Sequence, residues 1–286
     1  MLLTLSPADK TKIENIIQIL REQHPPGEDP WGLDLELVEK ALKLLTPLYR
    51  NYFKVRVIGA EKITSQSYVV ISNHSGQIPI DAMLIGLAFL LDVENPILLR
   101  PMVERFMTTL PFINKYASAL GAVLGDRQNA HYLLSKGQSI LVFPEGVKGI
   151  SKSSPDFYKL KDFSSGFYRM ASTHQTPILP LAVIGAEEMY PFVMHFKGLA
   201  NFVGFPALPL SFNLIPLPSP IDIYVGDEMK PEVNESEKKI SNNIYLLEQQ
   251  IKKMIVYGLA KRRPFFDFIR KPVSQFIIKE FRKKKE

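Results

Sequence analysis

Residues 67–91 read SYVVISNHSGQIPIDAMLIGLAFLL, and the changes of character along this stretch decide the fold. The first six residues are typical of a β-strand, and 82–91 form an apolar run that is too short to cross a bilayer and typical of a buried helix. Between them lies a polar turn, with His74 just after the strand and Asp81 at the start of the helix. This strand–turn–helix unit predicts an α/β fold, and such turns are a common location for chemistry.

The alternation of short strands and helices continues from about residue 54. We expect strands at 54–59, 67–72, 96–100, 121–124, 139–143, 177–185 and 221–226, and helices at 81–91, 103–116, 127–136, 164–174 and after the capping pattern at 234–237. This pattern predicts a mixed, largely parallel sheet flanked by helices, within a domain at 54–260. Two helices are expected before it, in an N-terminal helical segment at 1–53, the first with Ser6 as its cap and Pro7 at its first position.

The composition excludes several kinds of site. The chain has 286 residues, of which 46% are hydrophobic and none is cysteine. This length suits one large domain with a helical extension. The absence of cysteine excludes disulfides, a thiolate nucleophile and cysteine metal ligands. The first ten residues lack the basic start and the long apolar segment of a secretory signal.

The positive charge is concentrated near the C-terminus. Residues 261–286 contain ten Lys/Arg and three Asp/Glu, a net +7, so the other residues contribute −1 to the chain's +6. Val273, Phe276, Ile277 and Phe281 recur at helical spacing among these cations, which predicts a basic amphipathic tail that binds anionic lipid. Nucleic-acid binding and a solvated basic end are the rival interpretations, and the Phe/Ile periodicity favours the membrane over nucleic acid. We therefore expect peripheral association with the cytoplasmic face of a membrane.

A second apolar stretch, 198–221, is long enough to span a membrane and contains no charge. Its five prolines each cost about 3 kcal/mol inside a helix, which argues against a straight spanning helix. Two interpretations stay open: an apolar loop that lines a channel or dips into a lipid surface, and a Pro-rich crossover in the core.

His74 has the properties of a general base. Imidazole exchanges a proton near neutral pH, and Asp81 is the only acidic residue between His74 and Asp92. A carboxylate beside a histidine holds the ring in one tautomer and stabilises the imidazolium, although Asp81 is also at a position that caps a helix. Zinc needs three or four ligands, and no other His or carboxylate lies close in the sequence, so we expect no metal.

Arg127 opens a predicted helix directly after Asp126. A cation at a helix start is unfavourable for the helix dipole, but it suits the binding of an anion by the guanidinium and the free N–H groups. A surface arginine with no role is the alternative interpretation.

Glu145 and Gly146 follow the predicted strand 139–143. Because the carboxyl ends of parallel strands meet at one edge of a sheet, we expect His74 and the Glu145 loop to border the same apolar cavity. Lys148 follows and adds positive charge, but the phosphate-loop pattern Gly-x-x-x-x-Gly-Lys-Ser/Thr is absent, as is the Gly-x-Ser-x-Gly elbow of serine hydrolases.

Taken together, four blocks resemble the glycerolipid acyltransferase superfamily, the lysophosphatidic acid acyltransferase-like proteins. They are Asn-His…Asp at 73–81, Gly…Arg at 121–127, Phe-Pro-Glu-Gly at 143–146 and a Pro-containing strand at 176–188. The resemblance runs from about 55 to 226, and Phe-Pro-Glu-Gly is its most specific block. Six residues separate the His and the Asp, whereas the family's usual block has four, and this form looks like the branch related to monoacylglycerol acyltransferase-like proteins.

The resemblance implies a role for each matched position. His74 is expected to take a proton from an acceptor hydroxyl, and Asp81 to orient the imidazole. The implied substrate-binding residues are Arg127, aimed at a phosphate, together with Glu145, Gly146, Lys148 and Pro180.

The expected function is the transfer of a fatty acyl group to the hydroxyl of a lysophosphatidic acid-like acceptor in a membrane. Acyl-CoA or acyl carrier protein is the expected donor, and no cofactor is expected besides this co-substrate. A neutral mono- or diacylglycerol acceptor is the alternative. A lipid-binding protein without turnover and a thioesterase are alternatives of another class. Membrane lipids are the expected partners, and no nucleic-acid partner is expected.

Overall fold

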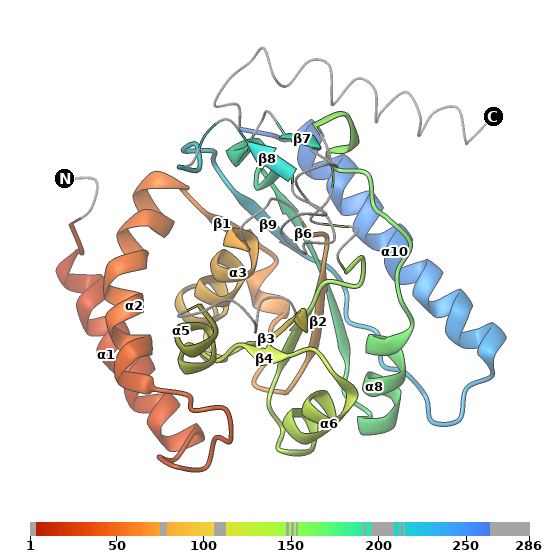
Figure 1. The fold of residues 1–286 in the computed structure, drawn as a ribbon, viewed down its shortest axis with the longest axis horizontal. Coiled ribbons are helices and arrows are strands. Elements are labelled where there is room, and N and C mark those ends of the chain that lie inside the picture. The colour runs from red at the N-terminus through yellow and green to blue at the C-terminus, as the bar shows by residue number, and fades with distance from the viewer. Residues whose placement is uncertain are drawn as a thin grey trace.

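The structure is a computed structural model, which describes residues 4–74, 79–105, 113–146, 149, 152, 154–190, 193–195, 209–211, 213 and 215–263. A seven-stranded sheet lies at its centre, in the order β1-β9-β6-β2-β5-β3-β4 (Figure 1). The strands are β1 (Arg56–Ile58), β2 (Val69–Ser72), β3 (Arg100–Val103), β4 (Val123–Leu124), β5 (Ile140–Val142), β6 (Ile178–Ile184) and β9 (Asp222–Val225).

Most of this sheet is parallel. β2 is parallel to both of its neighbours, β5 and β6, and β3 is parallel to β5 and β4. β9 is antiparallel to β6 and parallel to β1, so the two strands at one edge run the other way. The predicted mixed, largely parallel sheet is confirmed. Its parallel part brings the carboxyl ends of β2 and β5 side by side, where α/β proteins bind ligands.

Helices cover the sheet on both sides, with α1, α2 and α3 on one side and α8 and α10 on the other (Figure 1). The helices are α1 (Pro7–Gln23), α2 (Leu35–Pro47), α3 (Ile80–Leu91), α5 (Ile113–Ala119), α6 (Arg127–Ser135), α8 (Gly166–His174) and α10 (Glu237–Ala260). Short helical turns are η1 (Leu48–Tyr52), η2 (Ala60–Lys62), η3 (Ser154–Asp156) and η4 (Glu187–Met189). β7 (Val193–His195) and β8 (Pro209–Ser211) form a separate antiparallel pair.

Side-chain caps determine where several helices begin. The Ser6 hydroxyl accepts from the N–H of Asp9 at 3.1 Å, as the sequence predicts for α1. The capping pattern at 234–237 also starts a helix, and its capping residue is Ser236, which accepts from the N–H of Lys239.

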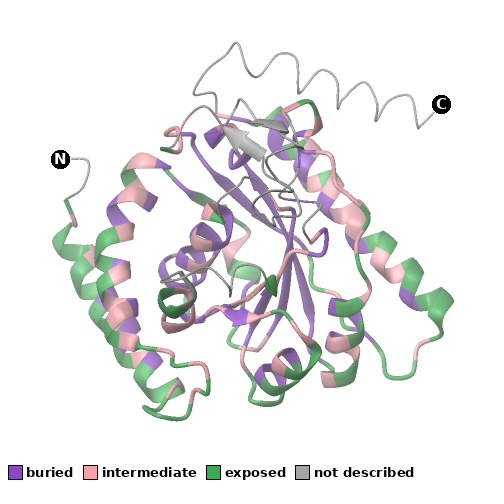
Figure 2. Ribbon diagram, in the orientation of Figure 1, coloured by how far each residue is buried: buried purple, intermediate pink, exposed green. Residues whose placement is uncertain are grey.

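The core lies along the sheet and its covering helices (Figure 2). Every residue of β2 and β6 is buried, because these central strands are covered on both faces. α3 is buried along most of its length, as its apolar sequence predicts.

β3 begins later than the sequence predicts. The apolar residues at 96–99 were expected in the strand, but the ladder with β5 starts only at Arg100, which pairs with Ile140. The preceding segment bonds to the end of α3 instead, since the N–H of Ile97 donates to the Phe89 carbonyl. The predicted helix at 103–116 is described only in part, because 106–112 lie outside the described residues.

The N-terminal helices pack on the α/β domain. α1 buries Ile13, Ile16, Ile17 and Leu20 in the common core. Arg50 forms an ion pair with Asp92 at 2.7 Å, beyond the C-terminal end of α3.

Two arginines of the predicted tail are bound to the domain. Arg262 pairs with Glu188 and Arg263 with Asp222, at 2.9 and 2.7 Å. The rest of the predicted amphipathic tail, 264–286, lies outside the described residues, as does most of 198–221. Among the helices that the structure describes, none has the length and apolar character needed to cross a membrane.

Candidate active site

His74 and Asp81 meet at the carboxyl edge of the sheet. His74 comes just after β2, Asp81 lies in the first turn of α3, and His74 Nδ1 is 2.7 Å from Asp81 Oδ2. The Asp81 side chain is fully buried, and its Oδ1 accepts from the N–H of Ala82 at 2.8 Å. A carboxylate only accepts, so the imidazole proton lies on Nδ1 and Nε2 keeps its lone pair. The six-residue separation therefore still yields a direct His–Asp contact.

The imidazole is also held by its surroundings. It stacks on the ring of Phe143, with centroids 3.8 Å apart and planes 15° apart. Gly149 lies behind it, where a Cβ would come within 2.9 Å of the His74 Cβ, so no larger residue fits without movement. The His74 side chain remains 12% exposed, which leaves the ring accessible from the cavity side.

Asn73 fixes the end of β2. Its side chain donates to the carbonyl of Val183 at 3.0 Å and accepts from the N–H of the same residue at 2.8 Å. The amide thus pairs with β6 beyond the last backbone pair of β2, Ser72 with Leu181. The position of His74 follows from this anchored strand end.

Glu145 lies beneath His74 rather than in the cavity. Its side chain has no exposed surface, and it accepts from the main-chain N–H groups of His74 at 3.0 Å and Lys161 at 2.7 Å. Lys152 forms an ion pair with it at 2.8 Å. The Glu145 carboxylate is thus bound by protein groups and is not part of the cavity wall. Its expected role in binding the acceptor stays a prediction.

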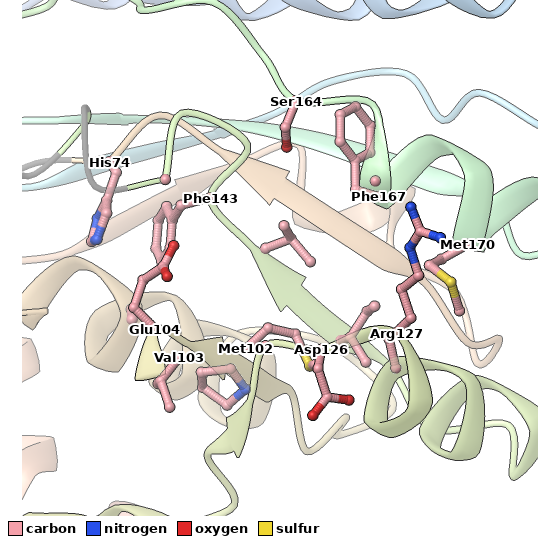
Figure 3. A pocket seen from close by; sticks show the side chains of 18 of the residues that line it. His74, Met102, Val103, Glu104, Asp126, Arg127, Phe143, Ser164, Phe167 and Met170 are labelled. Carbon is pink, nitrogen blue, oxygen red and sulfur yellow. The ribbon is translucent and has the colours of Figure 1, made fainter. Parts of the chain in front are cut away.

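A cavity of about 290 Å³ extends from His74 along the carboxyl ends of β3 and β5. Its wall is largely apolar, and Figure 3 shows His74 at one end with Arg127 and Met170 at the other. Besides these three, the wall includes Met102, Val142, Phe143 and Phe167. Along the cavity, an imidazole nitrogen is thus followed by an apolar passage and then by a cation.

Arg127 is the first residue of α6, which Asp126 caps by accepting from the N–H of Asn129 at 2.8 Å. Its side chain is exposed and, within the described part of the chain, has no carboxylate partner within ion-pair distance. α8 also begins at this cavity, with Gly166 in the wall and no side-chain bond from the capping residue Ser165. A free guanidinium near two helix N-termini favours an anion.

The other expected binding residues are placed differently. Gly146 lines the cavity with a left-handed φ of +56°. Pro180 lies within β6, next to Gly226, and is not part of the cavity wall. Lys148 lies outside the described residues. Within the described ranges, no group of three or more His, Cys, Asp or Glu side chains is arranged to hold a metal ion.

Sequence reasoning missed three residues near His74. Phe143 was noted only as part of a motif, whereas its ring stacks on the imidazole. Lys152 and Glu187 come from separate segments and meet Glu145 in the interior. The only signal for Lys152 was its place among the small and basic residues after Glu145, which does not separate it from Lys148.

The sequence is similar to a known protein family and to several known proteins. A family model described as Acyltransferase matches residues 54–184. An uncharacterized protein of Mycobacterium bovis is 32% identical over 212 residues, which cover 70% of this chain and 59% of that protein. A probable 1-acyl-sn-glycerol-3-phosphate acyltransferase of Mycoplasma pneumoniae is 22% identical over 184 residues, covering 61% of this chain and 65% of that protein.

Among solved structures, the crystal structure of the 1-acyl-sn-glycerophosphate (LPA) acyltransferase of Thermotoga maritima aligns with a TM-score of 0.48 and 16% identity, covering 86% of this chain and 96% of that one. The described fold and site are those of an α/β protein with a His–Asp pair at the carboxyl edge of a largely parallel sheet. The matched acyltransferase model and the acyltransferase relative support the assignment of this region of the chain to the glycerolipid acyltransferase superfamily.

Proposed function

We propose that this protein transfers a fatty acyl group from an acyl thioester to the hydroxyl of a lysophospholipid acceptor, of the lysophosphatidic acid type. The acyl carrier is coenzyme A or acyl carrier protein. The observation that carries the proposal is the His74–Asp81 pair at one end of an apolar cavity that has Arg127 at the other.

In the proposed reaction, His74 Nε2 takes the proton of the acceptor hydroxyl. The oxygen attacks the thioester carbonyl, the C–O bond forms, the C–S bond breaks, and the leaving thiolate receives the proton from the imidazolium. Asp81 stabilises the imidazolium through the 2.7 Å contact with Nδ1. Such general base catalysis contributes roughly a hundred- to ten-thousand-fold to the rate.

The phosphorylated acceptor is supported by Arg127. A guanidinium stays ionised at all relevant pH values and forms bidentate bonds to phosphate. With the phosphate near Arg127 and the helix N-termini, the glycerol hydroxyl extends along the cavity toward His74.

A neutral mono- or diacylglycerol acceptor is the second candidate. It is favoured by Glu104, which lines the cavity next to Gly146 and would repel a phosphate there. The long His–Asp block resembles the monoacylglycerol acyltransferase-like branch and points the same way.

The test is product analysis by mass spectrometry with a panel of phosphorylated and neutral lysolipids and both kinds of donor. Wild-type protein should acylate lysophosphatidic acid, His74→Ala should abolish transfer, and Arg127→Ala should reduce kcat/KM for phosphorylated acceptors by about tenfold or more while sparing neutral ones. If Arg127→Ala lowered kcat/KM equally for phosphorylated and neutral acceptors, Arg127 would not be a phosphate-binding residue.

Other outcomes decide the class of protein. Thiol release that ignores the acceptor would indicate a thioesterase, and no release with any donor would indicate a lipid-binding protein. Unchanged transfer by His74→Ala would overturn the assignment of the base.

A further inference from the structure

Lys152 is a buried lysine with an unusual set of partners. Its side chain is only 3% exposed. The ammonium group lies 2.8 Å from Glu145 Oε2 and 3.8 Å from Glu187 Oε1, two carboxylates that are buried themselves. It also donates to the main-chain carbonyl of His74 at 3.2 Å. Taking a charge of this kind out of water costs several kcal/mol, which its partners must offset.

Together, Lys152 and Glu145 hold both polar main-chain groups of His74. Glu145 accepts from the His74 N–H at 3.0 Å, and Lys152 donates to the His74 carbonyl at 3.2 Å. The ion pair between them joins the two contacts into one clamp. A buried ion pair is often no more stabilising than apolar residues of the same volume, so stability alone does not account for it.

Glu187 completes the charge balance of this cluster. Burial raises the pKa of its carboxyl to about 8, the charge of Glu145 acts in the same direction, and Lys152 opposes both. Near neutral pH, Glu187 is therefore largely protonated. One ammonium then faces one carboxylate, and the cluster beneath His74 carries no net charge.

We propose that Lys152 is a positioning residue for acyl transfer, one that fixes the main chain of His74 through its carbonyl and through Glu145 without contacting either substrate. This inference rests on the proposed function. Lys152 is not a phosphate-binding lysine, because its ammonium is enclosed by protein and is not part of the cavity wall. A shift of the imidazole by about 1 Å is enough to reduce a rate about a hundredfold.

The test uses variants that distinguish an effect on the position of His74 from an effect on the stability of the fold. Lys152→Met alone leaves the Glu145 carboxylate buried without its cation, so this variant is at risk of unfolding. The double variant Glu145→Gln/Lys152→Met removes both charges and keeps the volume. Its amide oxygen can accept from the His74 N–H, while the Lys161 N–H loses its acceptor. Lys159→Met is the matched control, since Lys159 lies nearby in the chain but pairs with Asp156 at the partly exposed surface.

The expected result is a split between kcat and KM. The double variant should lose about 10- to 100-fold in kcat, with KM for donor and acceptor within about twofold of wild type and a single cooperative thermal unfolding transition. Lys159→Met should match wild type in all three. A double variant that keeps wild-type kcat, or that loses its fold, would overturn the inference.

His74→Ala, measured alongside, distinguishes a failure of the proposed function from a failure of the proposed role of Lys152. If it abolishes transfer while the double variant is fully active, the proposed function stands and the role of Lys152 does not. If wild-type protein transfers no acyl group at all, both fall together.

Discussion

The imidazole of His74 depends on Asp81 for its tautomer as well as for its orientation. Asp81 uses one oxygen for the ring and the other for the N–H of Ala82, so the carboxylate cannot turn without losing a bond. This leaves Nδ1 protonated and Nε2 ready to accept a proton.

Asp81→Asn tests this dependence. The amide oxygen keeps the bond from Ala82, and the amide N–H then points at Nδ1, which must accept and so places the proton on Nε2. We expect kcat to fall by about a thousand- to ten-thousand-fold with little change in Tm. Steady-state kinetics with acyl-CoA measure this, and His74→Ala/Asp81→Asn should be no worse than His74→Ala alone. A loss below about tenfold would contradict the tautomer argument.

Glu187 makes the stability of the fold depend on pH. Burial raises the pKa of its carboxyl from 4.5 to about 8, so between these values the folded chain keeps a proton that the unfolded chain has lost. The free energy of unfolding therefore falls as the pH rises through this range, and Glu187 causes no further fall above it.

Glu187→Gln should remove this pH dependence. Relative to wild type, the variant should gain stability from pH 5 to pH 8, by at most about 1.4 kcal/mol per pH unit. Urea denaturation at pH 5.5, 7.0 and 8.0 measures the difference, and Glu61→Gln at an exposed position is the control. A difference that is constant or shrinks with pH would show that Glu187 is already ionised.

Sequence reasoning recognised His74 and Asp81 because they are close along the chain and lie in a motif with its own spacing. Lys152 follows β5 and Glu187 lies in η4 after β6, and both side chains lie near His74 only in the folded chain. No sequence periodicity links them to His74. Glu145 was found, but its direction was not, because a motif does not tell whether a carboxylate faces a cavity or the protein interior.

At the scale of elements, β2 carries His74 and β6 holds the end of β2. After the last backbone pair, Ser72 with Leu181, the side-chain amide of Asn73 bonds to β6. Both the N–H and the carbonyl of Val183 therefore have this one amide as their partner. Because His74 follows directly, the stability of this contact and the position of the base are coupled.

Asn73→Ala should lower the free energy of unfolding by about 2–4 kcal/mol, since it leaves a buried N–H and C=O without partners. We expect kcat to fall as well, by more than the fraction of unfolded protein explains. Urea denaturation and kinetics on one preparation measure both, with Asn242→Ala on the exposed surface of α10 as the control. A change below about 0.5 kcal/mol would mean that water or a backbone shift replaces the amide.

The strands themselves were largely predictable, because buried parallel strands read as short apolar runs between turn residues. β3 begins later than predicted because apolarity alone does not show which neighbour a segment bonds to. Ile97 bonds to Phe89 in α3, and the ladder begins only at Arg100. The order of the strands, with β9 antiparallel beside β6, depends on pairing between distant residues and carries no local signal.

At the scale of the whole molecule, elements outside the matched acyltransferase region are built onto it. The match ends at residue 184, whereas α10 packs against β6 and ends at Ala260. Just beyond α10, Arg262 is buried and bonded to Glu188, Ser219 and the Pro220 carbonyl. Three of the ten cations counted for the tail lie before residue 264: Lys261, which follows the last residue of α10, and the bound Arg262 and Arg263. Residues 264–286 therefore contain seven Lys/Arg and three Asp/Glu, a net +4.

Truncation at two neighbouring positions should separate membrane binding from folding. A chain that ends at residue 263 keeps both arginine contacts and should retain the wild-type Tm, while its binding to phosphatidylcholine vesicles containing phosphatidylglycerol weakens, since each basic residue near anionic lipid contributes about 1 kcal/mol. A chain that ends at residue 261 also loses Arg262 and Arg263. Glu188 then has no arginine partner, the buried Asp222 keeps only its ion pair with Arg56, and the chain should melt roughly 5–10 °C lower. Vesicle sedimentation and thermal unfolding measure the two effects, with pure phosphatidylcholine vesicles as the control for charge.

Undiminished vesicle binding by the chain ending at 263 would mean that lipid contacts lie elsewhere on the protein. Equal Tm values for both truncations would mean that the arginine contacts do not stabilise the domain.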